Sequence, residues 1–273
     1  MTTPETCFHH HDRETGRHCT RCGRPACASC LREASVGSQC WECVKDAAPP
    51  RTEQVRRTLR GATMPVTKAI IAANVAVFLL MAMRNNGNIE GTRAQTSWAL
   101  YGPAVAHGEW YRLVSSGFIH FGILHIAFNM LILYQVGLVL ESASGSSRFA
   151  TLYATSLLTG SLGALIASPH ALSGGASGAV FGVAAAATVA MYRQGVSFWQ
   201  TGFGPLLAIN LVLSFVIPNV SYGAHIGGLI GGALAAEGMI QSRRLQQPWL
   251  GYAIAIAISA IAVAASLAIA PST

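Results

Sequence analysis

The chain is poor in charged residues, and its later part is poor in cysteine and acidic residues. Only 11% of its 273 residues are charged, whereas 52% are hydrophobic and the mean hydropathy is +0.43. A typical soluble domain is about 25% charged, so this composition indicates a membrane protein. No aspartate follows Asp46, which excludes a membrane aspartyl protease. The first residues also lack the apolar core of a cleavable signal peptide.

The hydrophobic residues gather into seven segments, each near the roughly 20 residues that a helix needs to cross a bilayer. They predict an all-α polytopic membrane protein embedded in a lipid bilayer. We expect the spans at residues 67–83, 120–140, 148–167, 177–193, 203–217, 223–240 and 249–270.

Basic residues crowd the segment before residue 70, which leads into the first span. Such residues favour retention of that flank in the cytoplasm. We therefore expect a multi-pass protein with a cytoplasmic N-terminus and, with seven spans, an extracytoplasmic C-terminus. The net charge of +7 could also suit a nucleic-acid partner, but the membrane explanation accounts for the same residues better. The residues concerned are Arg51, Arg56, Arg57, Arg60 and Lys68.

All seven cysteines lie in the polar first part of the chain. Together with His10 they form four consecutive pairs, one Cys–His and three Cys–Cys, with two residues between the members of each pair. An odd number of cysteines and a reducing cytoplasm disfavour disulfides. Four such pairs instead predict two tetrahedral zinc ions, one held by three cysteines and a histidine and one by four cysteines. His9 and His11 are alternatives to His10. The predicted ligands are Cys7, His10, Cys19, Cys22, Cys27, Cys30, Cys40 and Cys43.

We therefore divide the chain into a zinc-binding module at residues 1–46, a linker at 47–65 and a transmembrane domain at 66–273. A module this short cannot build a large core, so metal binding is expected to supply most of its folding energy. Its role is either structural or the binding of a cytoplasmic partner.

Polar side chains inside a bilayer are costly and indicate function. Ser177 opens the fourth predicted span in "GASG", and His225 opens the sixth in "AHIGGLIGG". The fourth span carries a G-x-x-x-G spacing of small residues that let helices approach closely, as does the sixth. Both spans begin at the same membrane face, so a hydrogen bond from Ser177 to His225 is expected. An imidazole that takes the serine proton is the usual way to activate this nucleophile.

The segment "HFGILHIAFN" adds two polar residues to this site. His125 and Asn129 are four residues apart, about 40° around a helix, and can aim donors at one point. Packing by interhelical hydrogen bonds is the alternative role. With free N–H groups at the start of the Ser177 helix, they would stabilise an oxyanion. His120 and His125 differ by about 140° on the same arithmetic, a poor geometry for sharing a metal.

No carboxylate is placed to complete a catalytic triad, because those of the body lie in the outer loop or at the far ends of their spans. We therefore expect a Ser–His dyad that needs no cofactor for catalysis. No H-E-x-x-H motif is present, so a zinc metalloprotease is unsupported. The carboxylates concerned are Glu90, Glu109, Glu141 and Glu237.

These three motifs, in this order, resemble those of the rhomboid family of intramembrane serine proteases over residues 66–240. The resemblance implies a six-helix core with one helix added after it, Ser177 as nucleophile, His225 as base, and His125 and Asn129 as oxyanion donors. It also implies a role for His120 near the site. Its substrates would be single-span membrane proteins cut near the outer face.

Two details of this resemblance are looser. The family's Trp-Arg pair corresponds to Trp110 or Tyr111 with Arg112, and Phe181 stands where many members have a tyrosine that packs on the catalytic histidine. The cysteine order resembles B-box and related treble-clef modules, which implies interleaved zinc ligands. Cys7, His10, Cys27 and Cys30 would then share one ion, and the remaining four ligands the other.

Two other functions fit the same residues. A catalytically silent rhomboid-like protein would bind membrane helices while its zinc module recruits a partner. A metal-regulated protease would change its activity with zinc occupancy.

Overall fold

The computed structural model describes residues 5–34, 36–47, 63–87, 92–200, 203–216 and 220–272. The chain divides into two compact units, Met1–Gly61 and Ala62–Thr273. The predicted linker at residues 47–65 lies mostly outside the described residues.

The N-terminal unit is a small two-stranded module. A 3-10 turn, η1 (Ala28–Cys30), leads into β1 (Leu31–Glu33), which pairs antiparallel with β2 (Ser38–Cys40), and α1 (Trp41–Ala47) follows directly. Its buried apolar cluster consists of six cysteines together with Ala26 and Leu31. A core made largely of thiols supplies little hydrophobic stabilisation, so this unit needs another source of folding energy.

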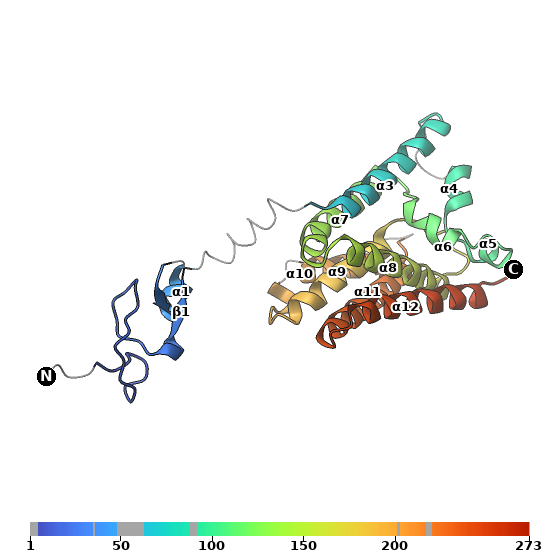
Figure 1. Ribbon diagram of the computed structural model, residues 1–273. Coiled ribbons are helices and arrows are strands. Elements are labelled where there is room, and N and C mark those ends of the chain that lie inside the picture. The colour runs from blue at the N-terminus through green and yellow to red at the C-terminus, as the bar shows by residue number, and fades with distance from the viewer. Residues whose placement is uncertain are drawn as a thin grey trace. The chain divides into compact units, whose positions relative to one another are not determined.

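The second unit is a helical bundle, as the composition predicts (Figure 1). Its long helices are α3 (Pro65–Arg84), α7 (Ile123–Ser144), α8 (Ser146–Ala167), α9 (Ser177–Tyr192), α10 (Phe203–Val216), α11 (Tyr222–Arg244) and α12 (Pro248–Ile269). Short helices α4 (Arg93–Trp98), α5 (Gly102–Ala106) and α6 (Arg112–Ser115), with η2 (Ser116–Phe118), lie between α3 and α7, and η3 (Phe198–Gln200) precedes α10.

Four of these helices, α3, α7, α8 and α12, are long and apolar enough to cross a membrane. Helices α9 and α10 are apolar but shorter. Helix α11 is long enough, but its six glycines and one histidine lower its hydropathy. The chain is thus a multi-pass membrane protein, and the total of seven spans stays a prediction.

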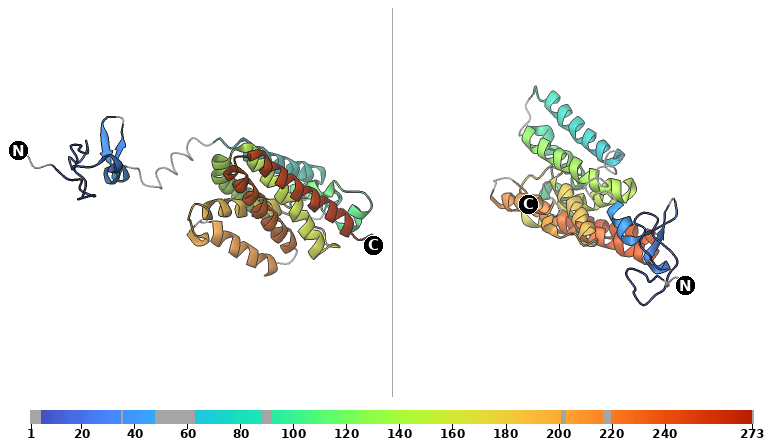
Figure 2. Two further views of the ribbon diagram at one scale, coloured as in Figure 1. Left: turned by 60° about the horizontal axis from the view of Figure 1, so that its bottom comes forward. Right: turned by 90° about the vertical axis from the view of Figure 1, so that its left-hand side faces the viewer.

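Helix α9 packs among α7, α8, α10 and α11, whereas α3 and α12 lie on opposite sides of the bundle (Figure 2). Burial follows this order: 61% of the apolar window of α8 is buried, but only 11% of that of α3. The centre of the unit is therefore formed by α8, α9 and α11.

Glycine makes this centre possible. A Cβ on Gly228 would overlap the carbonyl oxygen of Gly178, and a Cβ on Gly232 would overlap that of Gly182. The same applies between α8 and α11, where a Cβ on Gly163 would overlap the carbonyl oxygen of Gly223. Close backbone approach replaces side-chain packing at these crossings, so the tips of α9 and α11 are brought together.

A buried carboxylate fixes the start of α3. Glu141, near the end of α7 and 2% exposed, accepts hydrogen bonds from the backbone N–H of Val66 and of Thr67 at 3.0 and 2.8 Å. The hydroxyls of Thr67 and Ser146 donate to it at 2.6 and 2.7 Å. A negative charge at a helix N-terminus is favourable, so Glu141 attaches α3 to α7.

Candidate active site and metal clusters

Ser177 and His225 meet where two helices begin. Ser177 is the first residue of α9, His225 lies in the first turn of α11, and Ser177 Oγ is 2.7 Å from His225 Nε2. His225 is 6% exposed. The glycine contacts of the two helices set this distance, so the geometry allows transfer of a proton between hydroxyl and imidazole.

An aromatic ring holds the imidazole in place. Phe181, one turn after Ser177 on α9, stacks on His225 with 4.2 Å between ring centroids and 9° between ring planes. Phe181 is itself buried. The stack restricts rotation of the His225 ring and so keeps Nε2 directed at Ser177.

Gly175 separates Ser177 from a second histidine. A Cβ at this position would lie 2.7 Å from His125 Nε2 and 3.8 Å from Ser177 Oγ. Its φ of +124° is also one that side-chain-bearing residues rarely adopt. Both side chains thus flank the same small space, and only glycine leaves it open.

His120 was predicted to lie in the same helix as His125, and the structure corrects this prediction. Helix α7 begins at Ile123, not at residue 120, because Gly122 has a positive φ of 99° and ends the preceding turn. The helical angle between His120 and His125 is therefore meaningless, and their rings lie 5.1 Å apart, edge to face. His120 is 1% exposed, and its Nε2 accepts a hydrogen bond from the Ala176 N–H at 3.4 Å. It contacts the residue just before Ser177.

Asn129 is buried on the same helix as His125, and its Nδ2 donates to the His125 carbonyl oxygen at 2.8 Å. An amide nitrogen carries a second hydrogen, which this bond leaves available. The backbone N–H groups of Ser177 and Gly178 lie in the first turn of α9, where a helix has no internal acceptor for them. The first turn of α9 therefore supplies backbone donors beside Ser177.

The segment before Ser177 is supported by the loop between α3 and α7. Leu100 and Ser173 exchange two backbone hydrogen bonds, at 2.8 and 2.9 Å, and the Gly175 N–H donates to the Ser116 carbonyl at 2.9 Å. These contacts are backbone-mediated and leave no side-chain pattern in the sequence.

Gln95 supports the same region and was missed by sequence reasoning. Its Nε2 donates to the His120 carbonyl at 3.1 Å, and with Thr92 it forms a capping box at the start of α4. The spacing T-x-x-Q was a usable signal of that cap, but the contact with His120 is tertiary.

Arg112 connects separate segments of the loop between α3 and α7. It is 7% exposed and donates to the carbonyls of Thr96 and Ala99 at 2.7 and 2.6 Å and to Glu109 at 2.7 Å. The Arg112 guanidinium, helped by the Tyr111 hydroxyl, lowers the pKa of the Glu109 carboxyl below its usual range. Trp110 is 64% exposed, whereas the Tyr111 hydroxyl donates to Glu109, the partner of Arg112. Tyr111 is therefore the aromatic residue that accompanies Arg112 in this loop.

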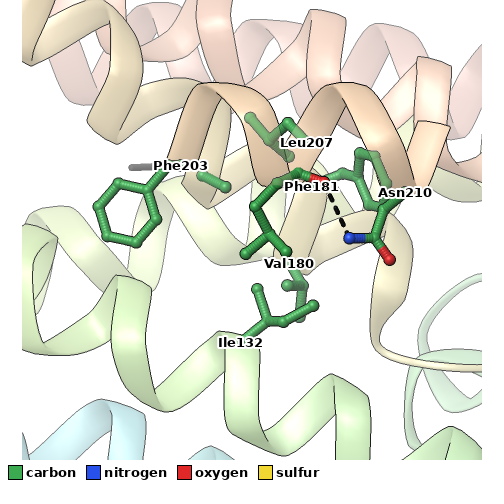
Figure 3. Close-up of a pocket in the computed structure, with 8 residues that line it drawn as sticks. Ile132, Val180, Phe181, Phe203, Leu207 and Asn210 are labelled. Atoms are coloured by element: carbon green, nitrogen blue, oxygen red, sulfur yellow. Dashed lines mark hydrogen bonds between the residues drawn. The ribbon is translucent and has the colours of Figure 1, made fainter. Parts of the chain in front are cut away.

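An apolar pocket opens beside Phe181, between α7, α9 and α10 (Figure 3). Ile132 of α7, Val180 of α9, and Phe203 and Leu207 of α10 line it. Because Phe181 stacks on His225, the pocket adjoins the Ser–His pair.

The N-terminal unit brings its eight predicted metal ligands into two clusters. Cys7, His10, Cys27 and Cys30 form one, and Cys19, Cys22, Cys40 and Cys43 form the other; within each, the ligand atoms lie within 4.8 Å of one another. The grouping is interleaved along the chain.

The spacing of the donor atoms suits a tetrahedral ion. His10 Nδ1 is 3.4 Å from Cys27 Sγ, and Cys22 Sγ is 3.8 Å from Cys40 Sγ. Thiolates around a tetrahedral zinc ion would be about 3.8 Å apart. The Ser29 hydroxyl, 3.0 Å from the Cys27 thiol, lowers the pKa of that thiol to about 5 and favours the thiolate that binds metal. His9 is outside the cluster and stacks on Trp41.

Comparison with known proteins agrees with this site. Residues 107–242 match the rhomboid domain. The rhomboid protease GluP of Bacillus subtilis (strain 168) is 36% identical over 177 residues, which are 63% of this chain and 34% of GluP. The protein YdcA of the same organism is 29% identical over 202 residues, covering 71% of this chain and 96% of YdcA.

A plant protein is similar over a shorter stretch. RHOMBOID-like protein 5 of Arabidopsis thaliana is 33% identical over 138 residues, 47% of this chain and 43% of that protein. The chain thus spans about a third of the length of GluP but nearly all of YdcA. Its membrane unit is a rhomboid domain, and the protein belongs to the rhomboid family.

Proposed function

We propose that this protein is an intramembrane serine endopeptidase in which Ser177 and His225 form the catalytic dyad. The single observation that carries the proposal is the 2.7 Å separation of Ser177 Oγ and His225 Nε2, within hydrogen-bond reach, at the joined tips of α9 and α11. A hydroxyl so placed can pass its proton to the imidazole as it attacks.

The reaction proceeds in two halves. Ser177 Oγ attacks the carbonyl carbon of the scissile peptide bond while His225 Nε2 takes the hydroxyl proton. His225 then gives that proton to the leaving amine nitrogen, and an acyl-enzyme remains. Water attacks the ester, its proton passes to His225, and Ser177 regains a proton as the new carboxylic acid leaves.

The negative oxygen of each tetrahedral intermediate needs donors that are already in position. We assign this role to the backbone N–H groups at the start of α9 together with the His125 ring and the second amide hydrogen of Asn129. His125 beside Gly175 and the burial of Asn129 support the assignment.

The substrate is inferred to be a single-span membrane protein. A small apolar recess between α7, α9 and α10 adjoins the dyad, so the surface next to the dyad is apolar, as a lipid-embedded segment requires. If the basic residues before α3 lie in the cytoplasm, an odd number of spans places the C-terminus on the other side. With seven spans the dyad then faces the extracytoplasmic side, where cleavage would occur.

We further infer that the two N-terminal clusters each hold one zinc ion. Three cysteines with one histidine, and four cysteines, are the donor sets of structural zinc sites. Such an ion cross-links the chain and supplies folding energy. A cytoplasmic protein partner for this unit remains part of the hypothesis that we drew from the sequence.

Cleavage of a panel of single-span substrates by the purified protein in liposomes tests the proposal. We expect specific products with the wild type and at least about a thousand-fold slower cleavage with Ser177→Ala. If the two proteins give the same products at the same rate, Ser177 is not the nucleophile and the proposed dyad is wrong. If neither protein gives products, the catalytically silent alternative stands.

A further inference from the structure

Helix α7 carries a glutamine that faces away from the bundle. Gln135 lies near the middle of α7, and its side chain is exposed. Three asparagines of the long helices donate from their amides within their own helix. Each donates to the carbonyl oxygen four residues earlier: Asn74, Asn129 and Asn210. Within the described residues, the Gln135 side chain makes no hydrogen bond. An amide left without a partner in hydrocarbon is costly, so Gln135 indicates a polar contact outside this chain.

The exposed neighbours of Gln135 form a single stripe along α7. Leu124, Phe128 and Leu131 are 72%, 61% and 52% exposed, and together with Gln135 they are spaced by four, three and four residues. Such spacing places side chains on one helical face and is the pattern by which one helix packs along another. We call these four residues the α7 stripe.

The stripe runs toward the active site. Leu124 precedes His125, and Ile132, one turn after Phe128, lines the apolar pocket beside Phe181 (Figure 3). A helix lying on the α7 stripe would have one end next to the dyad and one side against the entrance of that pocket. This continuity favours a substrate segment as the occupant over a second copy of the chain.

We propose that the α7 stripe binds the transmembrane segment of the substrate and that Gln135 selects a segment with a polar side chain, above all Asn or Gln, at a matching depth. The inference rests on the proposed protease function. Ten residues of helix separate His125 from Gln135, about 15 Å at 1.5 Å per residue. The polar residue is therefore expected about ten residues from the scissile bond.

A double-mutant cycle in liposomes tests this inference. The enzyme is wild type or Gln135→Leu, and the substrate carries Asn or Leu at each of the positions eight to twelve residues from its cleavage site. We expect kcat/KM of the wild type to be about three-fold higher for Asn than for Leu at one of these positions, the size of a typical hydrogen bond between membrane helices. Gln135→Leu should remove that preference, so that the ratio of the kcat/KM values for the Asn and Leu substrates falls to about one.

Labelling of Ser177 by a fluorophosphonate probe in both enzymes separates the outcomes. If the wild type neither labels nor cleaves, the proposed function fails. If both enzymes label and cleave but no position shows coupling with Gln135, the inference is overturned. The same holds if Gln135→Leu abolishes self-association in cross-linking without changing substrate preference, because the stripe then binds a second copy.

Discussion

At the scale of single residues, the site depends on how His225 is held. Its Nε2 faces the Ser177 hydroxyl. Two carboxylates of the long helices lie elsewhere: Glu141 holds the start of α3 and Glu237 pairs with Arg193. The stacked ring of Phe181 restricts rotation of the His225 imidazole, which would help to keep Nε2 directed at Ser177.

Phe181→Leu should therefore lower kcat by about three- to ten-fold, the worth of an aromatic contact, with little change in KM. Phe181→Tyr keeps the ring and should retain most of the activity. Initial rates on one model substrate measure both. A Leu variant as fast as the wild type would mean that the stack does not position His225.

Residue-level motifs were readable from the sequence because they follow fixed spacings. Ser177 and His225 could be placed at facing helix tips from their glycines alone. His120 could not, since the start of α7 at Ile123 depends on the backbone of Gly122. The contact of Gln95 with the His120 carbonyl could not be predicted either. It joins residues 25 apart in the sequence, and it depends on the fold of the loop rather than on the spacing of a motif.

At the scale of helices, the contact between Ser177 and His225 depends on the close approach of α9 and α11. Gly228→Ala would drive a Cβ into the Gly178 carbonyl oxygen and push the helices apart. We expect at least about a hundred-fold loss of cleavage, because a displacement of about 1 Å at reacting groups can have that effect. Leu234→Ala, on the exposed side of α11, removes atoms without creating a clash and should leave cleavage unchanged.

The attachment of α3 gives a second prediction at this scale. Each Glu141 oxygen accepts from one backbone N–H and one hydroxyl. Glu141→Gln removes the charge and replaces one of these oxygens with a donor NH2 group, so we expect a loss of about 2–4 kcal/mol in the free energy of unfolding. Glu237→Gln removes an exposed ion pair with Arg193 and should cost less than about 1 kcal/mol. Reversible denaturation in detergent compares the two, and equal losses would contradict a special role for Glu141.

Helix boundaries were predicted to within a few residues for most spans, since long apolar runs leave little choice. The span count was harder. Helix α11 has low hydropathy because of the glycines that allow its close packing, and α9 is short because it begins only at Ser177. The residues that make the site therefore weaken the composition signal on which span prediction depends.

At the scale of the whole molecule, two units with different sources of stability share one chain. The membrane unit is packed through its helices, whereas the N-terminal unit has mainly thiols at its centre. We expect two zinc ions per chain, one for each cluster. The double variant Cys7→Ser/His10→Ala should lose one ion, and His9→Ala/His11→Ala should keep both, as measured by elemental analysis of the purified protein.

Metal removal also separates the roles of the two units. If the clusters are structural, a chelator should unfold the N-terminal unit and leave cleavage by the membrane unit unchanged. A change in cleavage that follows zinc occupancy would instead support the metal-regulated alternative.

The most direct test of the account is labelling with a fluorophosphonate probe followed by mass spectrometry of the modified peptide. The account predicts one adduct, on Ser177, that is lost in Ser177→Ala and strongly reduced in His225→Ala. Equal labelling of the wild type and Ser177→Ala would contradict it.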